Sequence, residues 1–329
     1  MSSRATSLEQ PNMVRGLILD SSALSSFLFP RFLIAWFMSQ RYDQLITRES
    51  LHWGNVQPNP ENPQIWDDPT LYQIFFLKEH LRVVERAVAN GPKVLELGCG
   101  EDNLAIEMAN KGLDVTAIDL SPERIQRATE KAKDLSHPPK FQVGDLNTGS
   151  LPSSTFDCVV ANGSLHHILA LDRLLEEVRK TLKPAGKLVV FDFIGMGTLR
   201  KLFAALLYAV LPTYKPYSAK WQLRSRIAAF LSSEQKKRQA IESQETSALH
   251  PDSPFEEISG ASIIEEIRSR FKILETFTFL PFWYYLAPKI KLPQSLRYPT
   301  ARFFRRTDDL LVQFHLAKGA YAFIEAQKT

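Results

Sequence analysis

The middle of the chain alternates short runs of β-branched and other apolar residues with longer stretches whose apolar positions recur at helical spacing. The runs at 93–97 and 114–118 predict strands, and the stretches 103–111 and 121–135 predict the helices that follow them. A Ser-Pro-Glu sequence begins the second helix, where serine caps the end, proline suits the first position and the acid faces the helix dipole. This alternation predicts parallel strands joined by helical crossovers.

The same alternation continues toward the C-terminus, although two segments interrupt it. Further strands are expected at 140–143, 156–160, 187–193, 272–279 and 319–326, with helices at 170–182 and 262–270. We therefore expect a doubly wound α/β fold, in which helices cover both faces of a mostly parallel, seven-stranded Rossmann-like sheet.

The interrupting segments define the expected domain organisation. Residues 1–85 are predicted to form a helical N-terminal extension or lid, and 86–195 the core. Residues 196–257 are predicted to form a helical cap insertion, and 258–329 the remainder of the sheet. Insertions at the carboxyl edge of an open α/β sheet lie over the ligand crevice, so we expect both extra segments to cover a substrate.

Composition is ordinary for a soluble globular protein, with 44% hydrophobic and 23% charged residues among 329. The two cysteines, Cys99 and Cys158, lie in apolar stretches, which argues against a disulfide framework and favours a reducing cytoplasm. We expect no secretory signal at the N-terminus. Apolar stretches at 21–38, 202–214 and 276–288 are interrupted or short, so no membrane-spanning helix is expected.

The formal charge of +4 is too small to indicate a nucleic-acid partner, but the basic residues are concentrated in the C-terminal half. Residues 196–252 contain nine Lys or Arg and four Asp or Glu. Residues 281–306 contain six Lys or Arg and no Asp or Glu.

The strand at 93–97 leads directly into Gly98-Cys-Gly100 and then into a helix, which lets the backbone turn tightly and approach a ligand. Asp119 ends the next strand, 21 residues after Gly98, where a carboxylate can accept ribose hydroxyls. Asp145 and Leu146 follow the third strand, where they could take an adenine amino group and ring face.

With these motifs, the sequence over about 93–193 resembles the class I S-adenosylmethionine-dependent methyltransferases, of the kind that act on small molecules. The residues that carry the resemblance are Val94–Gly100, Ala117–Ser121, Gly144–Leu146, Phe156–Val160, Asn162–His167 and Leu182–Leu188. The resemblance implies S-adenosylmethionine as cofactor, with the glycine loop on its methionine part, Asp119 on the ribose and Asp145 on the adenine. Its implied cofactor contacts are Glu96, Gly98, Gly100, Asp119, Leu120, Asp145, Leu146 and Asn162.

One residue departs from the family pattern. Asp102 stands where a third glycine is common, and its carboxylate could repel the cofactor carboxylate or contact its amino group. A nicotinamide-binding dehydrogenase is the competing interpretation, although Asn103 occupies the last glycine position of that fingerprint. A catalytically inactive S-adenosylmethionine-binding accessory or scaffold protein is a further alternative.

Five side chains are candidates for the chemistry and for substrate contacts. His166 and His167 follow the fourth strand, where either could deprotonate an acceptor or simply pack. Tyr42, Trp53 and Trp283 are candidate substrate contacts, with packing of the helical segments as the alternative. The histidines are scattered and the cysteines lie 59 positions apart, so no metal site is expected.

Aromatic and basic residues occur together in the extension and the cap, at 27–37, 200–215 and 281–297. Such pairing suits an apolar acceptor bearing an anionic group, such as an isoprenoid, lipid, polyketide or modified peptide, and also peripheral association with a membrane. Burial of these stretches in a larger core is the alternative. A protein or nucleic-acid acceptor ranks lower, because the chain lacks an Asn/Asp-Pro-Pro-Tyr/Phe motif and a basic RNA-binding appendage. The atom methylated and the oligomeric state are not determined by the sequence.

Overall fold

The computed structural model describes residues 41–101, 103–217, 234–242, 249 and 253–329. The chain forms two compact units, Met1–Ile46 and Thr47–Thr329, and the second contains every strand of the described chain. The predicted division at residues 85, 195 and 257 stays a prediction. Helix α3 (Pro69–Asn90) belongs to the second unit because it buries Phe75, Phe76 and Val83 against the sheet.

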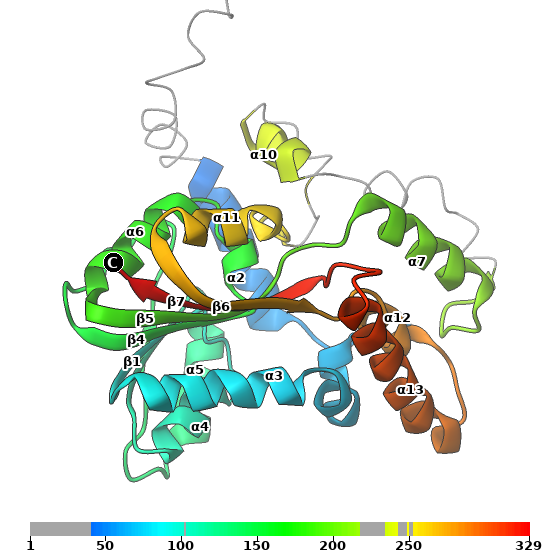
Figure 1. The fold of residues 1–329 in the computed structure, drawn as a ribbon, viewed down its shortest axis with the longest axis horizontal. Coiled ribbons are helices and arrows are strands. Elements are labelled where there is room, and N and C mark those ends of the chain that lie inside the picture. Colours follow the sequence, from blue (N-terminus) through cyan, green and yellow to red (C-terminus); the bar gives the residue numbers. More distant parts are fainter. Residues whose placement is uncertain (1–40, 102, 218–233, 243–248, 250–252) are drawn as a thin grey trace, which may run out of the picture. The chain divides into compact units, whose positions relative to one another are not determined.

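Seven strands form one sheet in the order β3-β2-β1-β4-β5-β7-β6 (Figure 1). The strands are β1 (Lys93–Leu97), β2 (Asp114–Asp119), β3 (Lys140–Val143), β4 (Phe156–Asn162), β5 (Leu182–Phe193), β6 (Phe271–Phe279) and β7 (Tyr321–Lys328). Strands β1 to β5 are parallel to one another, as predicted. Strand β7 is inserted antiparallel between β5 and β6, so the sheet is mixed.

Helices flank this sheet. Those that precede or connect the strands are α2 (Arg41–Asn55), α3, α4 (Leu104–Asn110), α5 (Pro122–Ala132), α6 (Leu171–Thr181) and α11 (Ile263–Arg268). The remaining described helices are α7 (Thr198–Val210), α10 (Glu234–Glu242), α12 (Trp283–Leu286) and α13 (Gln294–Gln313). As the Ser-Pro-Glu sequence predicts, the Ser121 side chain caps α5 by accepting the Arg124 amide at 3.4 Å.

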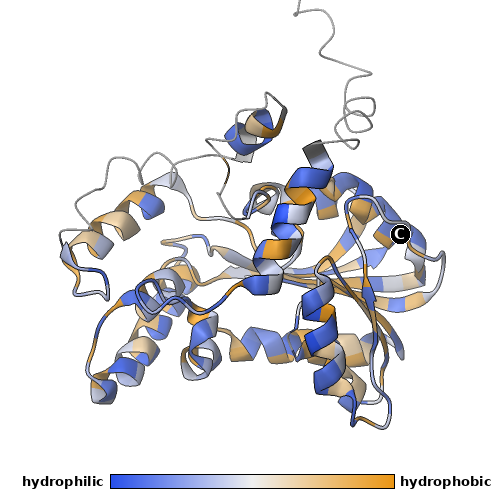
Figure 2. Ribbon diagram, turned by 180° about the vertical axis from the view of Figure 1, so that it is seen from behind, coloured by the Kyte–Doolittle hydropathy of each residue, from blue (hydrophilic) through white to orange (hydrophobic). Residues whose placement is uncertain are grey.

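Alternate residues of the strands point to opposite faces and enter two apolar clusters. On β5, Val189 and Phe191 join the cluster beneath α3 and α4, whereas Leu188 and Val190 join the cluster beneath α6 and α11. Figure 1 shows α3 and α6 on opposite sides of the sheet, and Figure 2 shows its strands as largely hydrophobic. A strand buried on both faces is continuously apolar, as residues 188–193 are, apart from Asp192.

No helix in the described part of the chain combines the length and apolar character needed to cross a bilayer. Both cysteines are buried as free thiols, and burial raises the pKa of the Cys158 thiol to about 12.

Candidate active site at the carboxyl edge of the sheet

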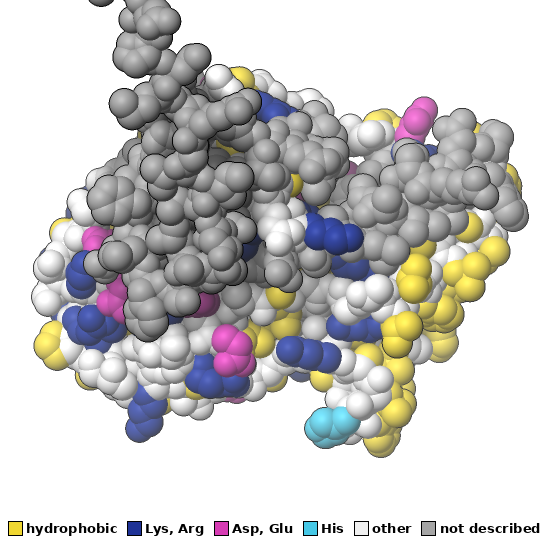
Figure 3. All heavy atoms as spheres, turned by 90° about the horizontal axis from the view of Figure 1, so that it is seen from above, with side chains coloured by type: hydrophobic (Ala, Val, Ile, Leu, Met, Phe, Trp, Pro, Cys, Tyr) yellow, Lys and Arg dark blue, Asp and Glu magenta, His cyan; other side chains and the backbone are white. Residues whose placement is uncertain are grey.

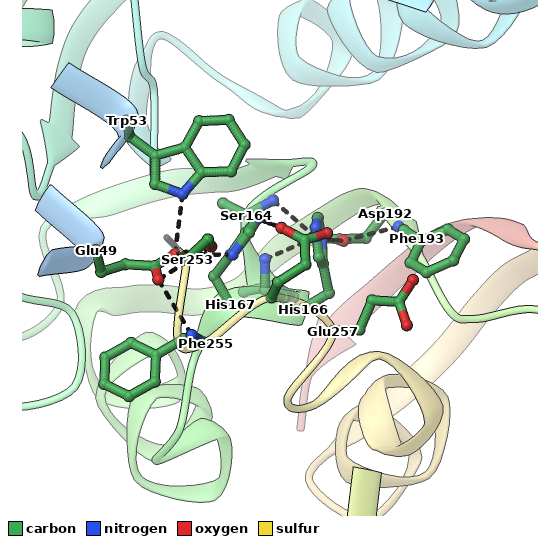
Figure 4. A network of polar contacts seen from close by, with 12 residues as sticks. Glu49, Trp53, Ser164, His166, His167, Asp192, Phe193, Ser253, Phe255 and Glu257 are labelled. Atoms are coloured by element: carbon green, nitrogen blue, oxygen red, sulfur yellow. Dashed lines mark hydrogen bonds and ion pairs between the residues drawn. The ribbon is translucent and has the colours of Figure 1, made fainter. Parts of the chain in front are cut away.

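Asp192, near the end of β5, organises the loop that follows β4 (Figure 4). Its carboxylate is fully buried and accepts the backbone amides of Ser164 at 3.0 Å and Leu165 at 2.7 Å through Oδ2. Its other oxygen, Oδ1, accepts the Phe193 amide at 2.7 Å and pairs with Nδ1 of His166 at 2.6 Å. In the neutral His166 ring, a proton on Nδ1 is donated to Asp192 and the lone pair is on Nε2.

Ser164 connects this loop to the glycine loop after β1. Its hydroxyl donates to the Leu97 carbonyl at 2.6 Å. A Cβ on Gly98 would lie 2.3 Å from the Ser164 Cβ, and Gly98 has a φ of +67°. Only glycine combines that backbone conformation with so close an approach, so the histidine loop and the glycine loop meet at this point.

His167 lies between two carboxylates from distant segments. Its Nδ1 is 3.1 Å from Oε1 of Glu49 on α2, and its Nε2 is 3.7 Å from Oε2 of Glu256. Burial by itself would lower the pKa of His167, but the charges of Glu256 and Glu49 raise that pKa to about 9. His167 is therefore a buried imidazolium at neutral pH, and its ring centroid lies 4.1 Å from that of His166.

Glu49 holds α2 and the segment after residue 252 around this imidazolium. Its carboxylate accepts the Trp53 indole N–H at 2.9 Å, the Ser253 hydroxyl at 2.9 Å and the Phe255 amide at 3.1 Å. Burial would raise the pKa of Glu49, but the bonds from His167, Phe255 and Trp53 lower it, so the buried carboxylate stays charged. A buried charge is tolerated when it is paired and hydrogen-bonded in this way.

Glu257, next to Glu256, is held by lysines instead. Its carboxylate lies 3.5 Å from the Nζ atoms of both Lys201 and Lys237. Burial by itself would raise the pKa of Glu257, but the charges of the two lysines lower this pKa.

The glycine loop is fixed against the end of β2. The amides of Gly98 and Cys99 both donate to the Ile118 carbonyl, and the Gly100 amide donates to Oδ2 of Asp119 at 2.8 Å. Oδ1 of Asp119 accepts the Ser121 amide at 2.9 Å. A carboxylate has about four lone-pair sites, so Asp119 keeps acceptor capacity for hydroxyl groups.

Trp53 links the two loops. Its ring meets that of His167 edge-on at 5.1 Å between centroids, and the Arg124 guanidinium lies 5.3 Å from its centroid. Arg124 in turn would be 2.6 Å from a Cβ on Gly100, whose φ is +57°. The structure therefore brings Trp53, His166 and His167 to the same edge of the sheet as the glycine loop.

Not every residue expected to contact the cofactor has the surroundings that role implies. The Asp145 carboxylate caps its own turn, accepting the Asn147 amide at 2.9 Å and the Thr148 hydroxyl at 3.0 Å. Leu146 is buried in the cluster beneath α6, whereas Leu120 is half-buried. Glu96 on β1 is almost fully buried and Asn162 at the end of β4 half-buried; Asp102 lies outside the described residues.

Of the two remaining candidate substrate contacts, Trp283 packs between α12 and α13. The Trp283 ring stacks on Phe304 of α13 at 3.9 Å between centroids, and its amide donates to Asp308. That ring is therefore used in packing α12 on α13. Tyr42 belongs to the first compact unit. Roles in substrate binding stay predictions for both residues.

His166, His167 and Glu256 each offer a possible metal-ligand atom, and these atoms lie within 4.8 Å of one another. Spacing along the chain did not reveal this group, because the fold brings Glu256 to the histidines from a distant segment. His167 already forms ion pairs with Glu49 and Glu256 at this position.

Sequence reasoning missed Asp192, Glu49 and Glu256. Asp192 had a detectable signal, since it is a charged residue inside an otherwise apolar strand. Glu49 and Glu256 lie in segments of mixed polarity with no such contrast, so only the fold identifies them.

Comparison with known proteins agrees with this geometry. A family model described as a methyltransferase domain matches residues 95–190. A sterol 4-C-methyltransferase of Caenorhabditis elegans is 27% identical over 118 residues, covering 35% of this chain and 35% of that protein. Phosphoethanolamine N-methyltransferase 1 of Arabidopsis thaliana is 36% identical over 104 residues, which cover 31% of this chain and 21% of that protein. The match thus spans about a third or less of these curated relatives.

Among solved structures, an S-adenosylmethionine-dependent methyltransferase from Mesorhizobium loti is 17% identical, with 75% of this chain and 97% of that chain covered at a TM-score of 0.42. The methyltransferase-domain match covers residues 95–190, the part that contains the strand, the glycine loop and Asp119 in their predicted order. This domain is therefore of the class I S-adenosylmethionine-dependent methyltransferase type, whose cofactor is S-adenosylmethionine.

Proposed function

We propose that the protein transfers a methyl group from S-adenosylmethionine to an oxygen or nitrogen of a small, largely apolar acceptor, with His166 as the general base. The observation that carries this proposal is the buried pair of His166 and Asp192 beside the glycine loop. An acceptor O–H or N–H must lose a proton when it is methylated, whereas a pre-formed nucleophile needs no base.

The residues of the cofactor site fit S-adenosylmethionine. Gly98 and Gly100 keep side chains out of the loop, and Asp119 is anchored by two amides while retaining acceptor capacity. We assign the loop to the methionine part and Asp119 to the ribose hydroxyls. The cofactor supplies a methyl group on a positively charged sulfur, and the chain's task is to position the nucleophile and remove its proton.

In this mechanism the acceptor's proton moves to Nε2 of His166. Asp192 holds the opposite nitrogen, fixes the ring orientation and stabilises the imidazolium that forms. His167 is already charged and held from both sides by Glu49 and Glu256, so we assign it to positioning the acceptor and shaping the pocket rather than to taking the proton.

The surroundings of His166 support an apolar acceptor. Its ring meets that of Phe193 at 5.8 Å between centroids, and Phe193 packs against Tyr321 at 5.3 Å and Tyr284 at 6.3 Å. The relatives named above act on a sterol and on phosphoethanolamine, two chemically different acceptors. The class of acceptor, such as an isoprenoid, lipid, polyketide or modified peptide, is therefore proposed from these aromatic neighbours of His166.

Calorimetry with S-adenosylmethionine and its demethylated product tests the cofactor site, and failure to bind either would refute it. Labelled methyl donor incubated with lipophilic extracts then tests transfer. We expect His166→Gln to lower transfer about 10²-fold or more with cofactor affinity preserved, whereas His137→Gln at an exposed loop position should change neither. Cofactor binding with no transfer to any extract would favour the inactive scaffold instead.

We also propose a cytoplasmic location, because both cysteines are free and buried, as suits a reducing compartment.

A further inference from the structure

Helix α7 exposes a continuous apolar stripe. Leu199, Leu202, Phe203, Leu206 and Val210 are 41% to 83% exposed, although they recur at the spacing that places residues on one face of a helix. At about 100° per residue they fall within an arc of roughly 100°. The opposite face of α7 is the one that packs on the protein, because Ala204 is fully buried and Leu207 contacts the core.

Helix α13 repeats this arrangement. Leu296, Phe303 and Leu310 follow one another at seven-residue spacing and are 49% to 62% exposed, and Phe314 directly after the helix is 64% exposed. The buried face is formed by Ala301, Arg305 and Asp308.

The two helices lie at the same end of the second unit. The rings of Phe203 on α7 and Phe282 pack at 5.3 Å between centroids, and Arg200 donates to the Pro281 carbonyl. After α7, the Pro212 carbonyl accepts the Lys291 amide, just before α13 begins. Figure 3 shows hydrophobic side chains gathered at this end, with Lys and Arg side chains beside them.

The free cations of this surface come from α13. Helix α7 contains no acidic residue, but its Arg200 and Lys201 are half-buried and bonded to Pro281 and Glu257. Helix α13 contains four arginines against two aspartates. Of the arginines, Arg302 and Arg306 are exposed, flank the α13 stripe and form no ion pair with any described residue. Helices with an exposed apolar stripe and a basic border are typical of proteins that lie in the interface of an anionic membrane.

We propose that the exposed faces of α7 and α13 dock on the surface of an anionic lipid bilayer. The apolar stripes enter the boundary between head groups and acyl chains, while Arg302 and Arg306 contact lipid phosphates. A second copy of the chain is the competing occupant, but two such basic surfaces would repel each other. This inference goes beyond the proposed function, and lipid binding can be measured without cofactor or acceptor, so the two can fail separately.

The experiment is co-sedimentation of the full chain with vesicles of phosphatidylcholine and phosphatidylglycerol, compared with vesicles of phosphatidylcholine alone. We expect binding to the anionic vesicles that weakens with salt. Leu199→Ser combined with Leu206→Ser should lower partition at least tenfold, and Arg302→Glu combined with Arg306→Glu should abolish the preference for anionic lipid. Both pairs are exposed, so the fold should persist.

The matched control is Leu77→Ser combined with Leu81→Ser on α3, two exposed leucines outside the surface, which should bind vesicles like the unmodified chain. The proposal is overturned if the unmodified chain does not bind anionic vesicles at low salt. It is equally overturned if the variant with Leu199→Ser and Leu206→Ser binds these vesicles as well as the unmodified chain. It is also overturned if sedimentation shows a dimer that the α7 variant dissociates and that excludes lipid.

Discussion

Replacing Asp192 with asparagine tests the centre of the proposed site, because the side chain keeps its shape and loses one acceptor oxygen. In the native protein one oxygen accepts the amides of Ser164 and Leu165, and the other accepts the Phe193 amide and the His166 ring N–H. Whichever way the asparagine is turned, its NH₂ group faces donors on one side. Two buried amides lose their acceptor if the NH₂ group faces Ser164 and Leu165. One does so if it faces Phe193 and His166, because the His166 ring can then change tautomer.

Each buried donor left without an acceptor costs about 1–3 kcal/mol, so the loss of one or two acceptors should lower the unfolding free energy by roughly 1–6 kcal/mol. For a chain of this size that corresponds to a fall in melting temperature of roughly 2–12 °C. The proposed role in transfer adds a second effect, since a base held in the wrong tautomer or orientation loses about 10²- to 10⁴-fold in rate.

Three measurements separate these effects. Thermal unfolding reports the stability loss, calorimetry reports cofactor affinity, and ¹⁵N spectra of labelled histidine report which ring nitrogen of His166 carries the proton. We expect Nδ1–H in the native protein, a disturbed tautomer in the variant and cofactor affinity within about threefold of the native value. Asp157→Asn is the control, because that carboxylate lies at the opposite end of β4 and pairs with Lys183 near the surface. Native-like stability together with Nε2–H in the unmodified protein would refute the reasoning.

Three further predictions concern the pH dependence of stability and the cofactor loop. Burial raises the pKa of Asp308 to about 7. The folded state therefore retains a proton that the unfolded state releases above about pH 4. Stability should fall as the pH rises from about 4 through 7. Asp308→Asn, which can still accept the Trp283 amide, should flatten that curve and gain about 2–4 kcal/mol at pH 8 in urea unfolding; an unchanged slope would contradict it. Gly98→Ala should lower the free energy of unfolding by about 2–4 kcal/mol and weaken cofactor binding, because its Cβ would overlap Ser164 and its φ is positive. A native melting temperature in this variant would be incompatible with the contact. Asp119→Ala should weaken S-adenosylmethionine binding at least several-fold in calorimetry, and unchanged affinity would remove the ribose assignment.

The aromatic and basic stretches show where sequence reasoning could not separate two outcomes. Both 200–215 and 281–297 combine apolar rings with cations. In the structure, Phe282, Tyr284 and Leu286 are buried, whereas one apolar face of α7, with Leu199, Phe203 and Leu206, is exposed. Periodicity shows that a segment has an apolar face, but which face finds a partner depends on the elements packed beside it. The exposed stripe of α13 was missed for the same reason.

The sequence by itself determined the local part of the fold and of the cofactor site. The strand at 93–97, the glycine loop, the helix cap at Ser121 and Asp119 depend on backbone preferences and on neighbours a few residues away, so they could be predicted in place. Tertiary structure alone decided the antiparallel insertion of β7, and it brought Asp192, Glu49 and Glu256 to the two histidines. These contacts join residues 26 to more than 100 positions apart, and pairing over such distances depends on burial and charge balance in the folded chain, which no local pattern encodes.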